Sequence, residues 1–398
     1  MSRNVYLVLI AQFLTAFADN AVLFTAITMI MQLSEPPSWY IPALQASFLV
    51  SFVLFAPWVG PFADSRSKPG VLTMANIVKG IGASLLLFQF EPLIAYAVIG
   101  LGAAVYSPAK YGILPELVDE KLLVKANGWI EGSTILAILL GTLVGAMVAE
   151  YSITIALMGV VGLYAVSGIV ALFIDKTPIA RGQREGAALP NFITMTRELL
   201  ATPRARFATL GVSLFWSAAT VLRVLLIAWA PVVLMLHSTT EVALLTMFVA
   251  IGIAIGSVLA PKFIPLTYLR RARMAAYAMG IVVVMLSFVD LLWAARGMLL
   301  LIGVAGGLFV VPINAALQEI GHRSVGAGGA VGIQNFFENL AMLTASGLYA
   351  AAAWMGAGPV STMLVLGLLI IVAAFAVSWH LPPDTSAISS LTDKDDKP

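Results

Sequence analysis

Long apolar runs are the feature that most constrains the fold of this chain. Runs of about 20 residues follow one another with short polar connections, and a helix of that length spans the roughly 30 Å of bilayer hydrocarbon. Because backbone groups in hydrocarbon must pair with each other, each run is expected to be a helix. The sequence therefore predicts an all-α, polytopic membrane protein with twelve transmembrane helices. The expected spans are 5–31, 40–63, 70–89, 93–113, 123–148, 152–174, 207–235, 241–263, 273–292, 297–318, 327–352 and 358–381.

The composition agrees with a membrane protein and argues against several other classes. The 398 residues are 60% hydrophobic and 11% charged, with a mean hydropathy of +0.97, whereas soluble domains carry roughly 25% charged residues. A net charge of +2 gives no reason to expect nucleic acid as a partner. With no cysteine and three histidines, we expect no thiol chemistry, no metal site and no cofactor. The first apolar run is too long for a cleavable signal peptide.

The basic residues predict the orientation. Of 22 Lys and Arg residues, only Arg296 falls in a loop on the side opposite the N-terminus. Since basic loops remain in the cytoplasm, both termini are expected there.

Segment 175–206 divides the chain into two six-helix halves, 1–174 and 207–382. Phe192, Met195 and Leu199 recur at helical spacing in this segment, which favours a short helix on the membrane surface, with a plain tether as the alternative. The polar tail 383–398 is expected to be disordered.

The two halves repeat a sequence pattern. Gly102-Ala-Ala-Val-Tyr-Ser-Pro108 in the fourth span matches Gly306-Gly-Leu-Phe-Val-Val-Pro312 in the tenth, at an offset of 204. Two parallel six-helix repeats with a long link resemble the major facilitator superfamily, whose substrate sites lie near the membrane midplane between the halves.

The loop between the second and third spans also resembles that superfamily. Gly60-Pro-Phe-Ala-Asp64-Ser-Arg66-Ser-Lys68 is similar to the signature G-x-x-x-D-x-x-G-[RK], with Ser67 in place of the usual glycine. The resemblance implies that Asp64, Arg66 and Lys68 take part in gating, by pairing the acid with basic groups and a helix end. The alternative is a tight basic turn.

Ionisable residues inside the spans are the candidate functional residues. Three acids and three bases lie there, so complete pairing is possible, and an unpaired charge at such a depth is costly. For each residue, the alternative is a structural ion pair. This alternative is favoured for Glu131 and for Lys79, which lies on a span that is peripheral in the superfamily. The six residues are Asp19, Lys79, Lys110, Glu131, Arg223 and Glu338.

Asp19 lies near the middle of the first span. At 100° per residue it shares a helix face with Gln12 and Thr15. A polar stripe at membrane depth must face a water-filled cavity or a charged partner. We therefore expect Asp19 to face a central cavity, across from Arg223 in the equivalent seventh span.

Three further residues suggest a substrate with an anionic group. The Arg223 guanidinium stays charged, and its planar fork suits phosphate or carboxylate. Glu338 has Gln334 one turn away, in position to bind a head group or to orient the carboxylate. Lys110, near the cytoplasmic end of the fourth span, is expected either to reach water or to hold an anionic group.

Together these polar clusters resemble the bacterial lysophospholipid transporters of the superfamily. The resemblance implies an inner-membrane protein that moves lysophospholipids from the periplasmic to the cytoplasmic leaflet. A partner acyltransferase/acyl-carrier-protein synthetase would then reacylate them. It also implies that Asp19, Asn20, Lys110, Arg223, Gln334 and Glu338 contact substrate, with Glu131 in gating. The motifs are Phe17-Ala-Asp19-Asn20-Ala21, Tyr106-Ser-Pro-Ala-Lys110-Tyr-Gly-Ile113, Val124-Lys-Ala-Asn-Gly128, Leu222-Arg223, Val311-Pro-Ile-Asn314 and Gln334-Asn-Phe-Phe-Glu338-Asn339.

Two other functions remain open at this point. A proton-coupled exporter of amphipathic drugs would also use a midplane acid, although a cation exporter would rarely place Arg223 in its cavity. A membrane acyltransferase needs a histidine paired with an acid, and only His380-Leu-Pro-Pro-Asp384 approaches that pattern. For a lipid substrate we expect access from the side, within the membrane, because an acyl chain loses about 0.8 kcal/mol per CH₂ on leaving hydrocarbon.

Overall fold

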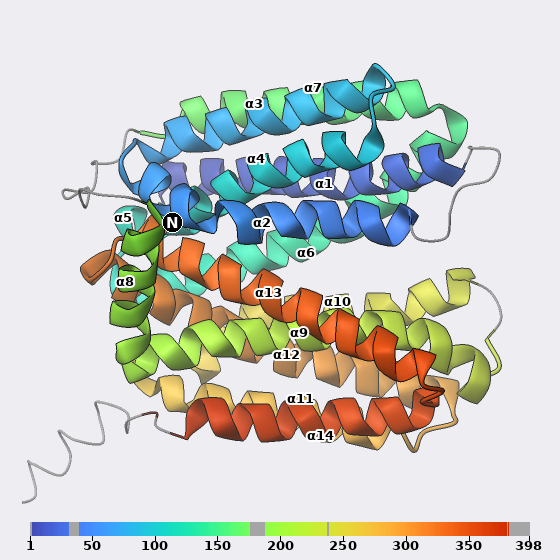
Figure 1. Ribbon diagram of the computed structural model, residues 1–398. Helices are drawn as coiled ribbons and strands as arrows, with labels where there is room; N and C mark the ends of the chain where they lie inside the picture. The colour runs from blue at the N-terminus through green and yellow to red at the C-terminus, as the bar shows by residue number, and fades with distance from the viewer. Residues whose placement is uncertain (1, 32–39, 176–187, 237–238, 380, 382–398) are drawn as a thin grey trace, which may run out of the picture. The chain divides into compact units, whose positions relative to one another are not determined.

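The computed structural model describes residues 2–31, 40–175, 188–236, 239–379 and 381. All regular secondary structure in these ranges is helical, which confirms the all-α prediction (Figure 1). The segment 176–187, the candidate His380-Asp384 pair and the tail 383–398 lie outside the described residues.

Twelve long helices coincide with the twelve expected spans. Ten of them are long and apolar enough to cross a membrane on their own. The other two are α11, which has only 15 residues, and α13, whose hydropathy is lowered by several polar side chains. The twelve are α1 Arg3–Met31, α2 Tyr40–Asp64, α3 Lys68–Leu87, α4 Pro92–Gly112, α6 Glu120–Tyr151, α7 Ile153–Leu172, α9 Pro203–Val233, α10 Thr239–Phe263, α11 Ala272–Leu286, α12 Leu292–Arg323, α13 Ala327–Trp354 and α14 Pro359–Ser378.

Three short helices complete the described chain. They are α5 Leu114–Leu117, α8 Ala188–Ala201 and the 3-10 helix η1 Leu266–Arg271. The chain divides into two compact units, each built from several segments. Unit 1 contains residues 1–119, 133–199 and 318–339, and unit 2 contains 120–132, 200–317 and 340–398. The two sequence halves remain a prediction.

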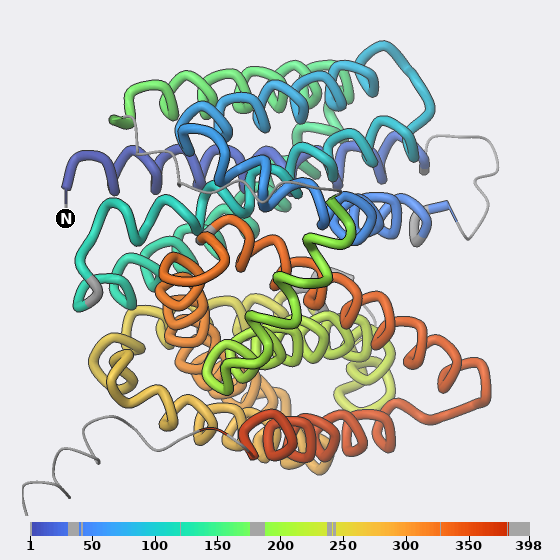
Figure 2. The backbone as a smooth tube through the Cα atoms, turned by 60° about the vertical axis from the view of Figure 1, so that its left-hand side comes forward, coloured from blue at the N-terminus to red at the C-terminus, as the bar shows by residue number. Residues whose placement is uncertain are grey.

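Unit 1 is a layer of tightly packed helices. Within it α1 packs against α7, α3 packs against both α4 and α7, and α2 packs against α4 (Figure 2). Its core contains fully buried aliphatic side chains such as Leu86 and Ile99 together with Tyr164. Large apolar side chains such as Ile77 and Leu143 are exposed on the outside, as expected for a surface that faces lipid.

Glycines permit the closest helix contacts. In unit 1, Gly141 and Gly145 of α6 lie directly against the backbone of α1 at Phe17 and Ala21. In unit 2, a side chain at any of four glycines on the facing sides of α10 and α12 would collide with the backbone of the other helix. These four are Gly252, Gly256, Gly303 and Gly307. Small residues thus allow these helix backbones to approach closely.

Helix α8 confirms the predicted amphipathic helix between the halves. Phe192, Met195 and Leu199 are its buried residues. The Phe192 ring lies 5.6 Å from the ring of Phe336 on α13, and Met195 lies against Gly329. The apolar face of α8 therefore packs on protein within unit 1. That the helix lies on the membrane surface stays a prediction.

Candidate functional site

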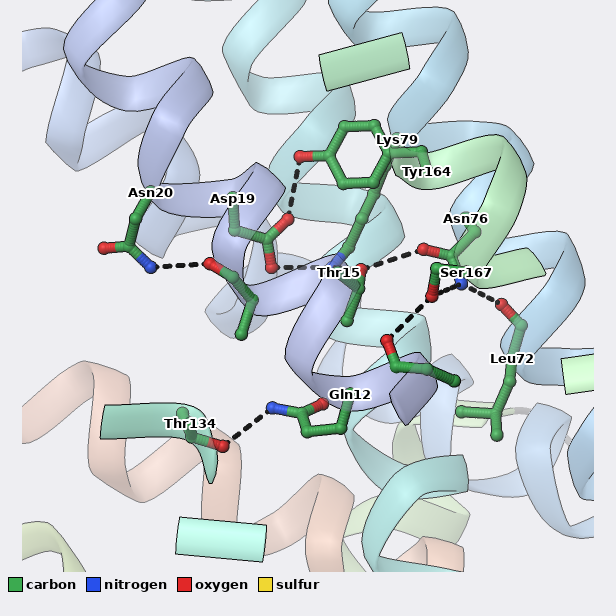
Figure 3. Close-up of polar contacts among 12 residues, drawn as sticks. Gln12, Thr15, Asp19, Asn20, Leu72, Asn76, Lys79, Thr134, Tyr164 and Ser167 are labelled. Atoms are coloured by element: carbon green, nitrogen blue, oxygen red, sulfur yellow. Dashed lines mark hydrogen bonds and ion pairs between the residues drawn. The ribbon is translucent and has the colours of Figure 1, made fainter. Parts of the chain in front are cut away.

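An ion pair between α1 and α3 lies at the centre of unit 1 (Figure 3). Lys79 Nζ is 2.7 Å from Asp19 Oδ2, and the hydroxyl of Tyr164 on α7 donates to Asp19 Oδ1 at 2.8 Å. Lys79 is 1% exposed, whereas the Asp19 side chain retains 21% of its surface. The carboxylate is thus held by two donors but can still be reached from one side.

Hydroxyl and amide groups extend this cluster through the helix interface. Lys79 also donates to Thr15 Oγ1 at 3.1 Å, and Thr15 donates to Asn76 Oδ1 at 2.8 Å. Asn76 in turn donates to Ser167, whose hydroxyl donates to the Ala11 carbonyl. The groups of this chain of hydrogen bonds come from α1, α3 and α7 (Figure 3), so the polar side chains around the ion pair bond to one another across the helix interface.

The sequence predicts part of this arrangement. Thr15 and Asp19 share a face and a partner, as expected, but Gln12 donates to Thr134 on α6 instead (Figure 3). Sequence reasoning missed Tyr164, and it favoured a purely structural role for Lys79. The available signal was Asn76 three residues before Lys79, because that spacing places two polar side chains on one helix face.

Asn20 follows Asp19 but points elsewhere on α1. Its amide donates to the carbonyl of Ala16 at 2.8 Å, one turn back (Figure 3). This bond occupies one of its two amide hydrogens. Its role in substrate binding stays a prediction.

The predicted gating loop forms a helix cap. Asp64, the last residue of α2, accepts hydrogen bonds from the backbone N–H groups of Gly328 at 2.9 Å and Gly329 at 2.8 Å. These are the free N–H groups in the first turn of α13, where the helix dipole favours a negative charge. Gly326 just before them has φ +91°, and a side chain there would also collide with the Asp64 carboxylate.

Lys68 stabilises this cap by pairing with the Asp64 carboxylate. Its ammonium group lies 3.1 Å from Asp64 Oδ1 and 3.7 Å from Glu116 Oε1, and the whole residue is buried. Arg66 is exposed and stacks over the Phe62 ring at 4.0 Å. Two of the three gating residues expected in this loop, Asp64 and Lys68, therefore share one contact network.

Polar groups of α4 and α13 meet in unit 1. The Ser107 hydroxyl donates to Asn335 Oδ1 at 3.3 Å, while the buried Asn335 Nδ2 has no acceptor among the described residues. Gln334 beside it is 3% exposed, and Glu338 one turn further is half-buried. The arrangement leaves one amide donor of Asn335 without an acceptor in the described part of the chain.

Lys110 lies on the same helix as Ser107. It is only 8% exposed, and Nζ sits 3.9 Å from the centre of the Tyr111 ring. Protein therefore covers most of this side chain, and its role in holding an anionic group stays a prediction.

Unit 2 contains the other two predicted residues. Arg223 lies in the middle of α9 with an exposed side chain, and within the described part of the chain it forms no hydrogen bond and no ion pair. The nearby hydroxyls of Ser213 and Ser217 donate to carbonyls of their own helix. Glu131 is 2% exposed and accepts a hydrogen bond from Asn314 at 3.1 Å.

The predicted site residues are divided between the two compact units. Asp19, Asp64, Lys110, Gln334 and Glu338 belong to unit 1, whereas Glu131 and Arg223 belong to unit 2. That Asp19 and Arg223 face one cavity stays a prediction.

Comparison with known proteins identifies the family. The sequence description of the Major Facilitator Superfamily matches residues 8–346. The chain belongs to this superfamily. Its backbone is similar to the fucose:proton symporter FucP of E. coli, with a TM-score of 0.76, 12% identity, and coverage of 95% of this chain and 98% of that one. It is also similar to the human organic anion transporter MFSD10, with a TM-score of 0.73, 15% identity, and coverage of 94% and 100%.

Curated relatives are more similar in sequence than these solved structures. The lysophospholipid transporter LplT of Klebsiella pneumoniae subsp. pneumoniae is 42% identical over 379 residues, covering 94% of this chain and 95% of the relative. LplT of Photorhabdus laumondii is 40% identical over 373 residues, covering 93% and 94%. The chain is therefore a multi-pass membrane protein of a transporter family.

Proposed function

We propose that this protein is a lysophospholipid transporter of the bacterial inner membrane, with both termini in the cytoplasm. It moves molecules such as 2-acyl-glycerophosphoethanolamine from the periplasmic to the cytoplasmic leaflet by alternating access. Likeness to LplT over nearly the whole chain supports this proposal. An acyltransferase/acyl-carrier-protein synthetase in the cytoplasm is its proposed functional partner.

The exposed Arg223 guanidinium is the structural observation that carries the proposal. A cation at mid-span without a hydrogen bond or ion pair to the described protein is costly in hydrocarbon, so it calls for an anion from outside the chain. A phosphodiester suits its planar fork, since two oxygens can accept from two N–H groups in parallel. The same guanidinium would repel a cationic drug, which disfavours an exporter of such drugs.

Polar groups of unit 1 are proposed to contact the rest of the head group. Asp19 keeps part of its carboxylate accessible, where a substrate ammonium group can approach. Asn335 offers an unused amide donor, with Gln334 and Glu338 on the same helix. We propose that Asp19, Asn20, Lys110, Gln334 and Glu338 contact the head group, and that Asp64, Arg66, Lys68 and Glu131 act in gating.

Substrate enters from the side in this mechanism, so that its acyl chain stays in hydrocarbon. Drawing a typical chain through water would cost more than about 10 kcal/mol at about 0.8 kcal/mol per CH₂. Two helix seams are suited to act as gates. In unit 2, Gly128 of α6 lies against the Ser257 carbonyl of α10, and in unit 1, Gly60 of α2 lies against Gly329 of α13.

Uptake of labelled lysophosphatidylethanolamine by spheroplasts tests the proposed function. Cells that express the chain should accumulate and reacylate the label, and cells that express Arg223→Gln at equal membrane levels should not. Parallel samples with an ionophore establish whether uptake depends on an ion gradient. Equal uptake with and without the wild-type chain would contradict the proposal.

A further inference from the structure

Arg296 is an unusual cation for its position. It is the one Lys or Arg that the sequence places in a loop on the side opposite the N-terminus. In the structure it lies in the second turn of α12, close to the helix start. Retaining a cation at such a place points to a negatively charged ligand.

Two aromatic rings hold the Arg296 side chain. The guanidinium carbon lies 4.6 Å from the ring centre of Trp293 and 5.6 Å from that of Phe248 on α10. Contact with ring faces leaves the edge of the guanidinium plane, which carries its donors, free to bond a coplanar oxygen pair. The three residues lie within unit 2. Arg296 and Phe248 are each one turn from the close contact between Gly252 and Leu300, so a tightly packed helix pair positions them.

The protein supplies no acceptor to this guanidinium. Within the described part of the chain, Arg296 forms no ion pair and no hydrogen bond, and its Nε atom is buried without a partner. Asp290 precedes α12, and Glu241 lies in the first turn of α10, the helix that supplies Phe248. Both are exposed, and neither pairs with it. The terminal amino groups of Arg296 therefore have their hydrogen-bonding capacity available to an oxygen from outside the protein.

The depth of Arg296 matches a lipid head group. Helix α12 has 32 residues, which at 1.5 Å per residue gives about 48 Å, longer than the roughly 30 Å of hydrocarbon. Arg296 lies one residue outside the expected apolar span 297–318. Trp293 is 71% exposed, as is common for the aromatic residues found at membrane interfaces. Both α10 and α12 begin at this end of unit 2 (Figure 1).

We propose that Arg296, Trp293 and Phe248 form a binding site for the phosphate group of a lysophospholipid in the outer leaflet. The site captures substrate before it reaches Arg223, and this inference rests on the proposed function. Terminal amino groups of Arg296 bond the phosphate oxygens, and the exposed ring of Trp293 covers the glycerol and the first part of the acyl chain.

Concentration dependence of uptake tests the capture site. Arg296→Gln should raise the half-saturating concentration of lysophosphatidylethanolamine by about 10-fold, the usual effect of losing one charge-assisted pair, with the maximal rate within about twofold. Arg296→Lys keeps the charge but loses the fork, so it should give a smaller increase. Arg271→Gln is the matched control, because Arg271 also stacks on an aromatic ring, that of Tyr268, at the other end of unit 2.

A competition assay identifies the group that is recognised. Inhibition of uptake by lysophosphatidylglycerol should weaken in Arg296→Gln, whereas inhibition by monoacylglycerol, which has no phosphate, should not change. An unchanged half-saturating concentration in Arg296→Gln would overturn the inference. So would a lower maximal rate alone, which is expected if Arg296 holds a diacyl phospholipid of the surrounding membrane. If Arg296→Gln does not reach the membrane, Arg296→Lys decides by the same criteria. Failure of the wild-type chain to transport any lysophospholipid would instead contradict the proposed function.

Discussion

Lys79 Nζ lies 2.7 Å from Asp19 Oδ2, so the most central acid of unit 1 already has a cation as its partner. The pair joins α1 to α3, and Tyr164 attaches it to α7. It therefore stabilises the three-helix core of the unit and also sets the position of a carboxylate that a head group can reach.

Replacing one member of this pair should destabilise the protein strongly. Lys79→Met leaves the Asp19 carboxylate without a cation, and breaking a buried pair costs about 3–5 kcal/mol. The double variant Asp19→Asn, Lys79→Met removes both charges and should recover most of that loss. Thermal unfolding of the purified protein in detergent measures the effect.

Uptake assays on the same variants separate structure from function. If Asp19 binds the head group, the double variant should be stable but inactive. Recovery of both stability and uptake in the double variant would show that the pair is structural only.

Arg223→Lys should reduce lysophospholipid uptake by at least about 10-fold, because the variant keeps the charge but loses the bidentate fork. Quantitative uptake at matched membrane levels is the measurement. Arg206→Lys, a conservative change near the start of the same helix, should have no such effect. Transport at the wild-type rate by Arg223→Lys would argue against contact with the phosphate.

Asp64→Asn should loosen the start of α13. The variant removes the charge and one of the two acceptors that bond the N–H groups of Gly328 and Gly329, a loss of about 1 kcal/mol. A single cysteine at Ser107, beside Asn335, should then react with a water-soluble maleimide about fivefold faster than in the background chain. The absence of native cysteine makes this label specific.

Asp175→Asn serves as the control for that experiment. Asp175 is an exposed carboxylate that accepts from Asn4, so its loss should leave the labelling rate at Ser107→Cys unchanged. Equal labelling rates in Asp64→Asn and in the control would mean that the cap does not hold this end of the unit closed.

Cross-linking the two glycine-lined seams should block uptake if substrate enters laterally. One engineered cysteine pair joins α6 to α10 near Gly128, and the other joins α2 to α13 near Gly60. Each pair is compared before and after reduction, so that every sample is its own control. Normal uptake with both seams covalently closed would exclude lateral access.

Local patterns in the sequence predict the helices well. Each expected span coincides with a long helix, because runs of apolar residues in a bilayer have few alternatives to a helix. The spacing of Phe192, Met195 and Leu199 predicts the buried face of α8 for the same reason, since helical periodicity is a local property.

Contacts between distant segments are harder to predict. Tyr164 lies 145 residues from its partner Asp19, and neither its own helix, which is apolar all round, nor its neighbours mark it as part of the site. The apolar face of α8 does not by itself specify whether lipid or protein covers it, so its packing on Phe336 and Gly329 is not predictable from the spacing. Asp64 was predicted to meet a helix end only through the resemblance to the superfamily.

The glycine contact between α10 and α12 has a practical consequence. Where Gly252 and Gly303 meet, the two backbones touch without intervening side chains, so neither helix can slide without breaking contact along several turns. A pair of spectroscopic probes on these two helices should therefore report one unchanging distance throughout the transport cycle. That distance would serve as an internal ruler, against which the movement of every other helix can be measured.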